Sequence, residues 1–150
     1  MKKTITSIAA ALLMIISFSS FAAKPIYSAA PTASSNTLSA YVSSLTEGLN
    51  DFNNMIFAKD FEYRNTADRT EKTFNRRQYM QFLKNNKGLK FDCTTTYQIL
   101  DETGNTSLAK VTMAFRDFTR VDYVTLHAND RGWKVSKVVT TYPTTSTVVQ

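Results

Sequence analysis

The sequence predicts an α+β domain: a cone-shaped, curved antiparallel sheet covered by about three N-terminal helices. Its first half places apolar residues at helical spacing, and from Leu89 onward the apolar period changes to two. In residues 121–139, VDYVTLHANDRGWKVSKVV, two alternating runs flank a turn-forming stretch and predict a hairpin. Helices followed by a run of strands are typical of the α+β class.

The first 22 residues predict a secretory signal peptide. Lys2 and Lys3 form a basic start, residues 8–16 are apolar, and residues 20–22 offer a small-residue cleavage site. The apolar run falls short of the roughly 20 residues that a transmembrane helix needs, although a retained N-terminal anchor is the alternative. Cleavage would imply export to the periplasm or medium of a bacterium, with no stable membrane anchor afterwards.

The rest of the chain divides into a flexible segment at 23–36, rich in Ala, Ser, Pro and Thr, a domain at 37–142, and a disordered tail at 143–150. Removing Lys2 and Lys3 lowers the lysine and arginine count from 18 to 16 against 12 acidic residues, a net charge of +4. These charges are dispersed along the chain, which argues against a nucleic-acid partner. With one cysteine, Cys93, and one histidine, the chain has a poor ligand set for zinc.

The helices are predicted by their apolar spacing and their end signals. A first helix is indicated by a stripe that Ser35, Asn36 or Thr37 could cap and Gly48 would end: Leu38, Tyr41, Val42 and Leu45. A second, short helix from near Asn50 or Asp51 is indicated by Leu49, Phe52, Ile56 and Phe57. A third spans Arg76 to about Asn86, is capped by Asn75, and has an apolar face of Tyr79, Phe82 and Leu83.

Strands are predicted at 61–64 and 71–74, and longer ones at 91–100, 107–115, 118–127 and 133–142. Strands of about ten residues exceed the usual five or six, so the sheet must twist and curl. A curled sheet closed by helices forms a cone with an interior pocket.

Three segments of the last hairpin resemble the end of nuclear-transport-factor-2-like domains: DYVTL at 122–126, GWKV at 132–135 and KVV at 137–139. The chain is most similar to the small exported members grouped as SnoaL-like or putative lumazine-binding proteins, over residues 38–142. The resemblance implies the cone-shaped fold. It implies no single activity, because that superfamily includes isomerases, dehydratases, cyclases, epoxide hydrolases and non-catalytic binding domains.

Enzymes of this fold usually place an Asp inside the cone, where an apolar environment raises the carboxyl pKa and allows proton transfer. The candidates here are Asp122, Asp92 and His127. Asp122 and His127 are five residues apart on one predicted strand and therefore face opposite sides, so they cannot form a direct pair. For Asp122, an ion pair or hydrogen bond at the sheet surface, with Arg120 or Lys137, is favoured over catalysis. His127 is expected to be an exposed side chain beside a turn.

The candidate ligand-binding residues are aromatic, although each is more readily a core or rim residue: Tyr63, Tyr97, Tyr123 and Trp133. The sequence contains no phosphate loop, nucleophile elbow, zinc spacing or dinucleotide fingerprint, so no cofactor or metal is predicted. We therefore expect a non-catalytic domain that binds a small apolar or aromatic ligand or a partner. The alternative is a cofactor-independent isomerase, dehydratase or cyclase that uses a pocket Asp with Tyr or His.

A homodimer through the outer face of the sheet is also expected. Residues 134–142 carry apolar side chains on both faces of their strand. A strand that is buried on both faces loses its clean polar–apolar alternation.

Overall fold

The computed structural model describes residues 32–70 and 72–144. The predicted signal peptide, most of the segment at 23–36 and the tail from residue 145 lie outside the described residues. The elements, in chain order, are α1 Ala33–Thr46, α2 Asn53–Ile56, β1 Phe57–Asn65, β2 Thr73–Asn75, α3 Arg76–Asn85, β3 Thr94–Thr103, β4 Thr106–Ala114, β5 Thr119–Asn129 and β6 Gly132–Thr141.

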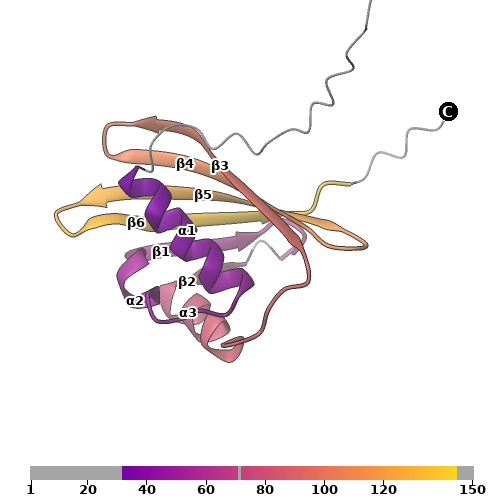
Figure 1. Cartoon of the computed structure of the whole chain (residues 1–150). Helices are drawn as coiled ribbons and strands as arrows, with labels where there is room; N and C mark the ends of the chain where they lie inside the picture. The colour runs from indigo at the N-terminus through magenta and orange to yellow at the C-terminus, as the bar shows by residue number, and fades with distance from the viewer. Residues whose placement is uncertain (1–31, 71, 145–150) are drawn as a thin grey trace, which may run out of the picture.

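The six strands form one curved sheet in the order β2-β1-β6-β5-β4-β3. Neighbouring strands are antiparallel except β1 and β6, which run parallel, so the sheet is mixed. The helices lie on one side of it: α1 packs mainly on β6, and α3 packs on β1 and β2 (Figure 1). This arrangement confirms the predicted α+β class with helices segregated onto one face.

The hairpin that the sequence predicts from residue 121 is present as β5 and β6. Val121 pairs with Thr141 at one end, and Asn129 pairs with Gly132 at the turn. A bulge between Thr125 and Leu126 shifts the register by one residue. Because residues two apart share a face, Arg120, Asp122, Val124 and Leu126 all point from β5 toward the helices.

The start of the domain differs from the sequence prediction. Residues 33–36, expected to belong to the flexible segment, form the first turn of α1, and Thr32 caps this helix by accepting a hydrogen bond from the Ser35 amide (3.3 Å). The second helix is only four residues long, because Phe57 already belongs to β1. Helical spacing alone could not separate this short helix from the strand that follows it.

The third helix agrees closely with the prediction. Asn75 accepts a hydrogen bond from the Gln78 amide (3.1 Å), and the Gln78 side chain accepts one from the Asn75 amide (2.9 Å). This reciprocal capping box fixes where α3 begins. It therefore fixes which way Tyr79 and Phe82 leave the helix.

The core fills the space between the helices and the concave face of the sheet. Its fully buried large side chains include an acid and a tyrosine among apolar residues: Tyr41, Phe61, Leu38, Leu83, Met113, Leu126, Val111, Val124, Val135, Val138, Thr140 and Asp122. The centre of the cone is therefore occupied by side chains. The pocket described below lies beside β1, β2 and α3 instead.

Candidate functional site

A charged group sits in the core where strands β5 and β6 meet. Asp122 is completely buried, and Arg120, two residues earlier on the same face, donates from Nε to Oδ1 at 2.9 Å and from Nη2 to Oδ2 at 3.0 Å. Thr140 lies directly across from Asp122 on β6 and donates its hydroxyl to Oδ1 at 2.6 Å. This bidentate ion pair combines charge with fixed geometry.

Two buried tyrosines extend the hydrogen-bond network of Asp122 into the helices. The Tyr41 hydroxyl, from α1, donates to Asp122 Oδ2 at 2.8 Å. That hydroxyl has only one proton, so in its 3.3 Å contact with the Tyr79 hydroxyl the donor is Tyr79. The hydroxyl protons therefore point in sequence from Tyr79 to Tyr41 to Asp122.

The Asp122 carboxylate is saturated by these contacts. Each of its oxygens accepts two hydrogen bonds, from Arg120 and Thr140 at Oδ1 and from Arg120 and Tyr41 at Oδ2. A general base needs a free lone pair within reach of the proton that it removes. This carboxylate could act as a base only if the network rearranged.

The electrostatics hold the network in one protonation state. Burial, followed by the Asp122 charge, raises the pKa of both Tyr41 and Tyr79 above the ordinary tyrosine value. Burial lowers the pKa of Arg120, but the charge of Asp122 opposes this effect, and the net pKa of Arg120 is raised. Both tyrosines therefore stay neutral and Arg120 stays charged at any physiological pH.

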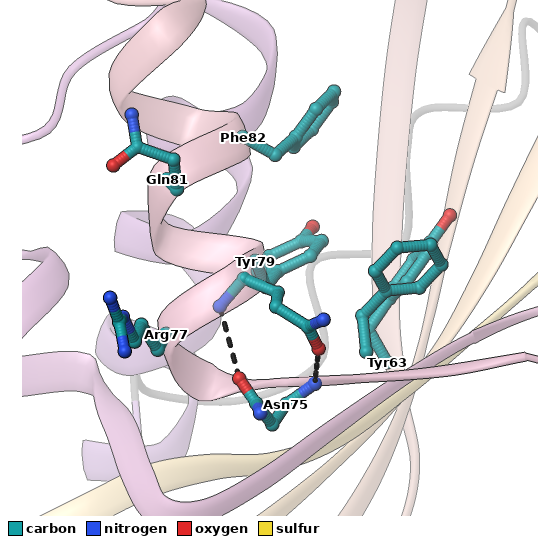
Figure 2. Close-up of a pocket in the computed structure, with 8 residues that line it drawn as sticks. Tyr63, Asn75, Arg77, Tyr79, Gln81 and Phe82 are labelled. Atoms are coloured by element: carbon teal, nitrogen blue, oxygen red, sulfur yellow. Dashed lines mark hydrogen bonds between the residues drawn. The ribbon is translucent and has the colours of Figure 1, made fainter.

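A pocket of about 650 Å³ lies between β1, β2 and α3. Four aromatic rings and four polar side chains line it: Tyr63, Phe74, Tyr79, Phe82, Asn75, Arg77, Gln78 and Gln81. Figure 2 shows Tyr79 and Phe82 leaving α3 on the side of Tyr63, whereas Arg77 and Gln81 leave it on the other side. The aromatic part of the lining is therefore gathered on one side of the helix.

The pocket rings contact one another. Tyr63 and Tyr79 stack with their centroids 4.9 Å apart, Phe74 lies 6.0 Å from Tyr63, and Phe82 lies 5.8 Å from Tyr79. Tyr63 and Phe74 are direct cross-strand partners on β1 and β2. Such offset and tilted pairs are favourable arrangements for aromatic side chains.

Tyr79 joins the pocket to the buried network, because its ring lines the pocket and its hydroxyl bonds to Tyr41. Tyr63 adjoins the same network. Its pKa is raised by burial, although hydrogen bonding with Thr140 and the Arg120 charge act in the opposite direction. Two of the four aromatic rings of the pocket, Tyr63 and Tyr79, are therefore in contact with the buried network.

The structure separates the four predicted ligand-binding aromatics. Tyr63 lines the pocket. Tyr97 and Trp133 are half-buried and pack against the core, and the Trp133 carbonyl accepts a hydrogen bond from the Thr37 hydroxyl at 3.4 Å. Tyr123 is exposed on the opposite face of the sheet, because its position in β5 differs by one residue from Asp122.

The three predicted catalytic candidates do not come together. Asp92 is exposed ahead of β3, and His127 is exposed on the outer face, where its Nδ1 lies 3.1 Å from the Thr106 hydroxyl. Asp122 is paired with Arg120, one of its two predicted partners, but the pair lies in the core beneath the helices. The sheet-surface location expected for this pair is therefore wrong, because α1 covers this part of β5 and its Tyr41 hydroxyl contacts Asp122.

Three residues of the network were not among the predicted site residues: Tyr41, Tyr79 and Thr140. Tyr41 and Tyr79 occupy apolar stripes of helices, where they read as core residues. The signal that could have identified them is that each is a tyrosine and not a phenylalanine, because a buried hydroxyl requires a hydrogen-bond partner. Thr140 had no such signal, because threonine is common in strands.

The described residues also bear on two other features, a metal site and a membrane-spanning helix. Within residues 32–70 and 72–144, no three His, Cys, Asp or Glu side chains gather closely enough to hold a metal ion. In the same part of the chain, none of the helices has the length and apolar character needed to cross a membrane.

A family model described as putative lumazine-binding matches residues 30–141. The chain belongs to this family. The match covers α1 through β6, so both the pocket and the buried network of this putative lumazine-binding domain fall inside it. A comparison with curated proteins finds no match.

Solved structures confirm the nuclear-transport-factor-2-like fold. An NTF-2 like protein of unknown function from Silicibacter pomeroyi DSS-3 is 13% identical, covers 74% of this chain and 93% of its own, and gives a TM-score of 0.60. An NTF2-like protein of unknown function from Methylobacillus flagellatus KT is 18% identical, with 75% and 90% covered and a TM-score of 0.59. An NTF2-like protein from Cytophaga hutchinsonii is 13% identical, with 72% and 93% covered and a TM-score of 0.58.

Proposed function

We propose that this domain binds a small planar aromatic ligand in the pocket beside α3 and does not transform it. The observation that carries the proposal is the lining, in which four aromatic rings gather around Tyr63 and Tyr79 and four polar side chains complete the wall. A pocket of about 650 Å³ falls within the range of small-molecule sites, which combine an apolar wall with a few polar groups. The family description suggests lumazine, a planar bicyclic heteroaromatic molecule, as the first ligand to test.

The saturated carboxylate supports binding without turnover. Asp122 already accepts four hydrogen bonds, and the Tyr79 hydroxyl donates inward to Tyr41. A ligand on the pocket side therefore meets the Tyr79 ring while the Tyr79 proton is engaged elsewhere. A cofactor-independent isomerase, dehydratase or cyclase would need to break this chain of hydrogen bonds before a proton could move.

The test is to titrate the protein with lumazine, monitoring lumazine fluorescence, and to repeat the titration with Tyr63→Ala. Removing one stacking ring should weaken binding by roughly 5- to 150-fold, which corresponds to base–aromatic stacking of about 1–3 kcal/mol. Tyr123→Ala is the matched control, because it removes a tyrosine from the opposite face of the sheet. Equal losses in both variants would contradict the pocket assignment.

Native mass spectrometry of the protein purified from its host extends the test to an unidentified ligand. We expect a retained small molecule in the wild-type and Tyr123→Ala proteins, and its loss in Tyr63→Ala. A ligand that survives Tyr63→Ala would place binding elsewhere. Consumption of the retained molecule during incubation, abolished by Asp122→Asn, would favour the enzyme alternative.

The same experiment addresses export. We propose that the chain is exported and cleaved after Ala22, since residues 1–22 have the three-part pattern of a signal peptide. Intact mass should correspond to a chain that begins at Ala23. A mass that includes residues 1–22 would contradict cleavage.

A further inference from the structure

Four large apolar side chains are exposed on the segments that join α1 to β1 and α3 to β3. They are exposed by 49% at Leu49, 55% at Phe52, 63% at Met55 and 56% at Leu89, and we call them the end patch. The loop from the end of α1 to α2 passes beside α3, where Asn50 donates to the Leu83 carbonyl (Figure 1). Contiguous exposed apolar side chains of this kind mark interaction sites.

Backbone contacts bring the two segments of the end patch together. The Gly88 amide donates to the Gly48 carbonyl at 3.1 Å, and the Phe91 amide donates to the Thr46 carbonyl at 2.8 Å. Leu49 and Leu89 follow these two glycines. Leu49 and Leu89 are therefore brought close together although they are about forty positions apart in the chain, and Phe52 and Met55 follow Leu49 within seven residues.

In the loop that carries the patch, polar side chains are buried and apolar side chains are exposed. Asn53 is buried, accepts a hydrogen bond from Ser44 at 2.6 Å and donates to Asn50 at 2.9 Å. Asn50 in turn donates to the Leu83 carbonyl at 3.0 Å. Polar side chains thus hold the loop from inside while Phe52 and Met55 point outward, the reverse of the usual distribution.

Basic side chains surround the patch. Lys87 and Lys90 lie on either side of Leu89 and are exposed, Lys84 precedes them in the last turn of α3, and the Lys134 ammonium donates to the Met55 carbonyl. The same two connecting segments carry three exposed carboxylates, at positions 47, 51 and 92, so the four lysines exceed the acids by one. Apolar side chains inside a basic border match the chemistry of an anionic membrane surface.

We propose that the end patch docks the protein reversibly on anionic lipid bilayers. Phe52, Met55 and the two leucines would enter the interface while the lysines contact lipid phosphates. A bilayer accepts apolar side chains that project from a loop and requires no complementary shape. This docking is independent of the ligand pocket, because no lining residue of the pocket belongs to the end patch.

Depth quenching tests the proposal directly. In a Trp133→Phe background, Phe52→Trp supplies the reporter and Leu100→Trp, at an exposed position on the edge strand β3, supplies the control. On vesicles of brominated phosphatidylglycerol and phosphatidylethanolamine, the emission of the Phe52→Trp protein should be quenched and that of the control should not. Absence of quenching at position 52 overturns the proposal, whatever the N-terminus of the chain contributes to vesicle binding.

Charge and oligomeric state complete the test. Lys87→Gln and Lys90→Gln should each lower the partition coefficient on anionic vesicles roughly fivefold, with little change on phosphatidylcholine. If Phe52→Ser with Met55→Ser instead turns a dimer into a monomer in light scattering, the patch is a contact between copies. That result would also overturn membrane docking.

Discussion

At the scale of single residues, the feature with the largest expected effect on stability is the buried charge of Asp122. Arg120 is also buried, so each charge depends on the other for its stability. We expect Asp122→Asn to lower the free energy of unfolding by about 3–5 kcal/mol, because it leaves the Arg120 charge uncompensated. Urea denaturation followed by circular dichroism measures this. Asp92→Asn, at an exposed site, should change stability by no more than about 0.5 kcal/mol, and equal losses would show that the network adds nothing.

The two buried tyrosines make stability sensitive to alkaline pH. Their pKa values are raised in the folded state, chiefly by burial, so folding keeps protons that the unfolded chain releases near its ordinary tyrosine pKa of 10.0. Their contribution is fully present below that pH and is lost as pH rises above it, by up to about 1.4 kcal/mol per pH unit for each tyrosine.

We therefore predict that, between roughly pH 9.5 and pH 11, the melting temperature falls more steeply in the wild type than in Tyr41→Phe. These two pH values bracket the ordinary titration of tyrosine. Scanning calorimetry across this window provides the measurement. Tyr123→Phe serves as the control because Tyr123 is exposed. Parallel curves for the wild type and Tyr41→Phe would mean that the Tyr41 proton is not linked to folding.

At the scale of elements, the joint between α1 and α3 depends on Gly48. Its φ is +66°, and a Cβ there would lie 2.4 Å from the Gly88 nitrogen. We expect Gly48→Ala to cost about 3 kcal/mol, from the left-handed backbone together with the clash. Gly104→Ala is the control because Gly104 has a similar φ of +60° with open space around it, and it should cost about 1 kcal/mol.

Denaturant midpoints of the two glycine variants decide this comparison. If Gly48→Ala and Gly104→Ala lose the same stability, the close approach of residues 48 and 88 is not a constraint. A larger loss at Gly48 should be accompanied by faster hydrogen exchange at the Gly88 amide, which bonds to the Gly48 carbonyl.

At the scale of the whole molecule, we propose that the outer face of the sheet forms a homodimer. Tyr123 and Leu108 are exposed there, and Val121 and Val139 lie beside them on β5 and β6. We predict that Tyr123→Glu shifts the mass in light scattering from dimer to monomer without loss of folding, since a charge in an apolar contact is costly. Asp92→Asn should leave the mass unchanged, and a wild-type monomer at micromolar concentration would contradict the dimer.

The sequence by itself determined the elements and the class of fold. Periodicity placed the core face of α1 and, in α3, the buried Tyr79 and Leu83, but it also assigned Phe82 to that face, which is exposed and lines the pocket. The capping residue Asn75 placed the start of α3 correctly. Period-two alternation located β3 to β6 to within a few residues, and it placed Asp122 and His127 on opposite faces. These features are local, because they depend on the spacing of residues within one segment.

The tertiary structure alone decided the site. Nothing local indicates that β1 lies parallel to β6, that Tyr79 of α3 meets Tyr41 of α1, or that Tyr41 reaches Asp122. These two tyrosine contacts join positions 38 and 81 residues apart, and they form only when α1 lies between α3 and β5 with its Tyr41 hydroxyl turned to both. Of the apolar stripe predicted for the second helix, the packing buried Ile56 and Phe57 but left Leu49 and Phe52 exposed, and the side chain of Asn53 is buried beside them through its hydrogen bonds to Ser44 and Asn50.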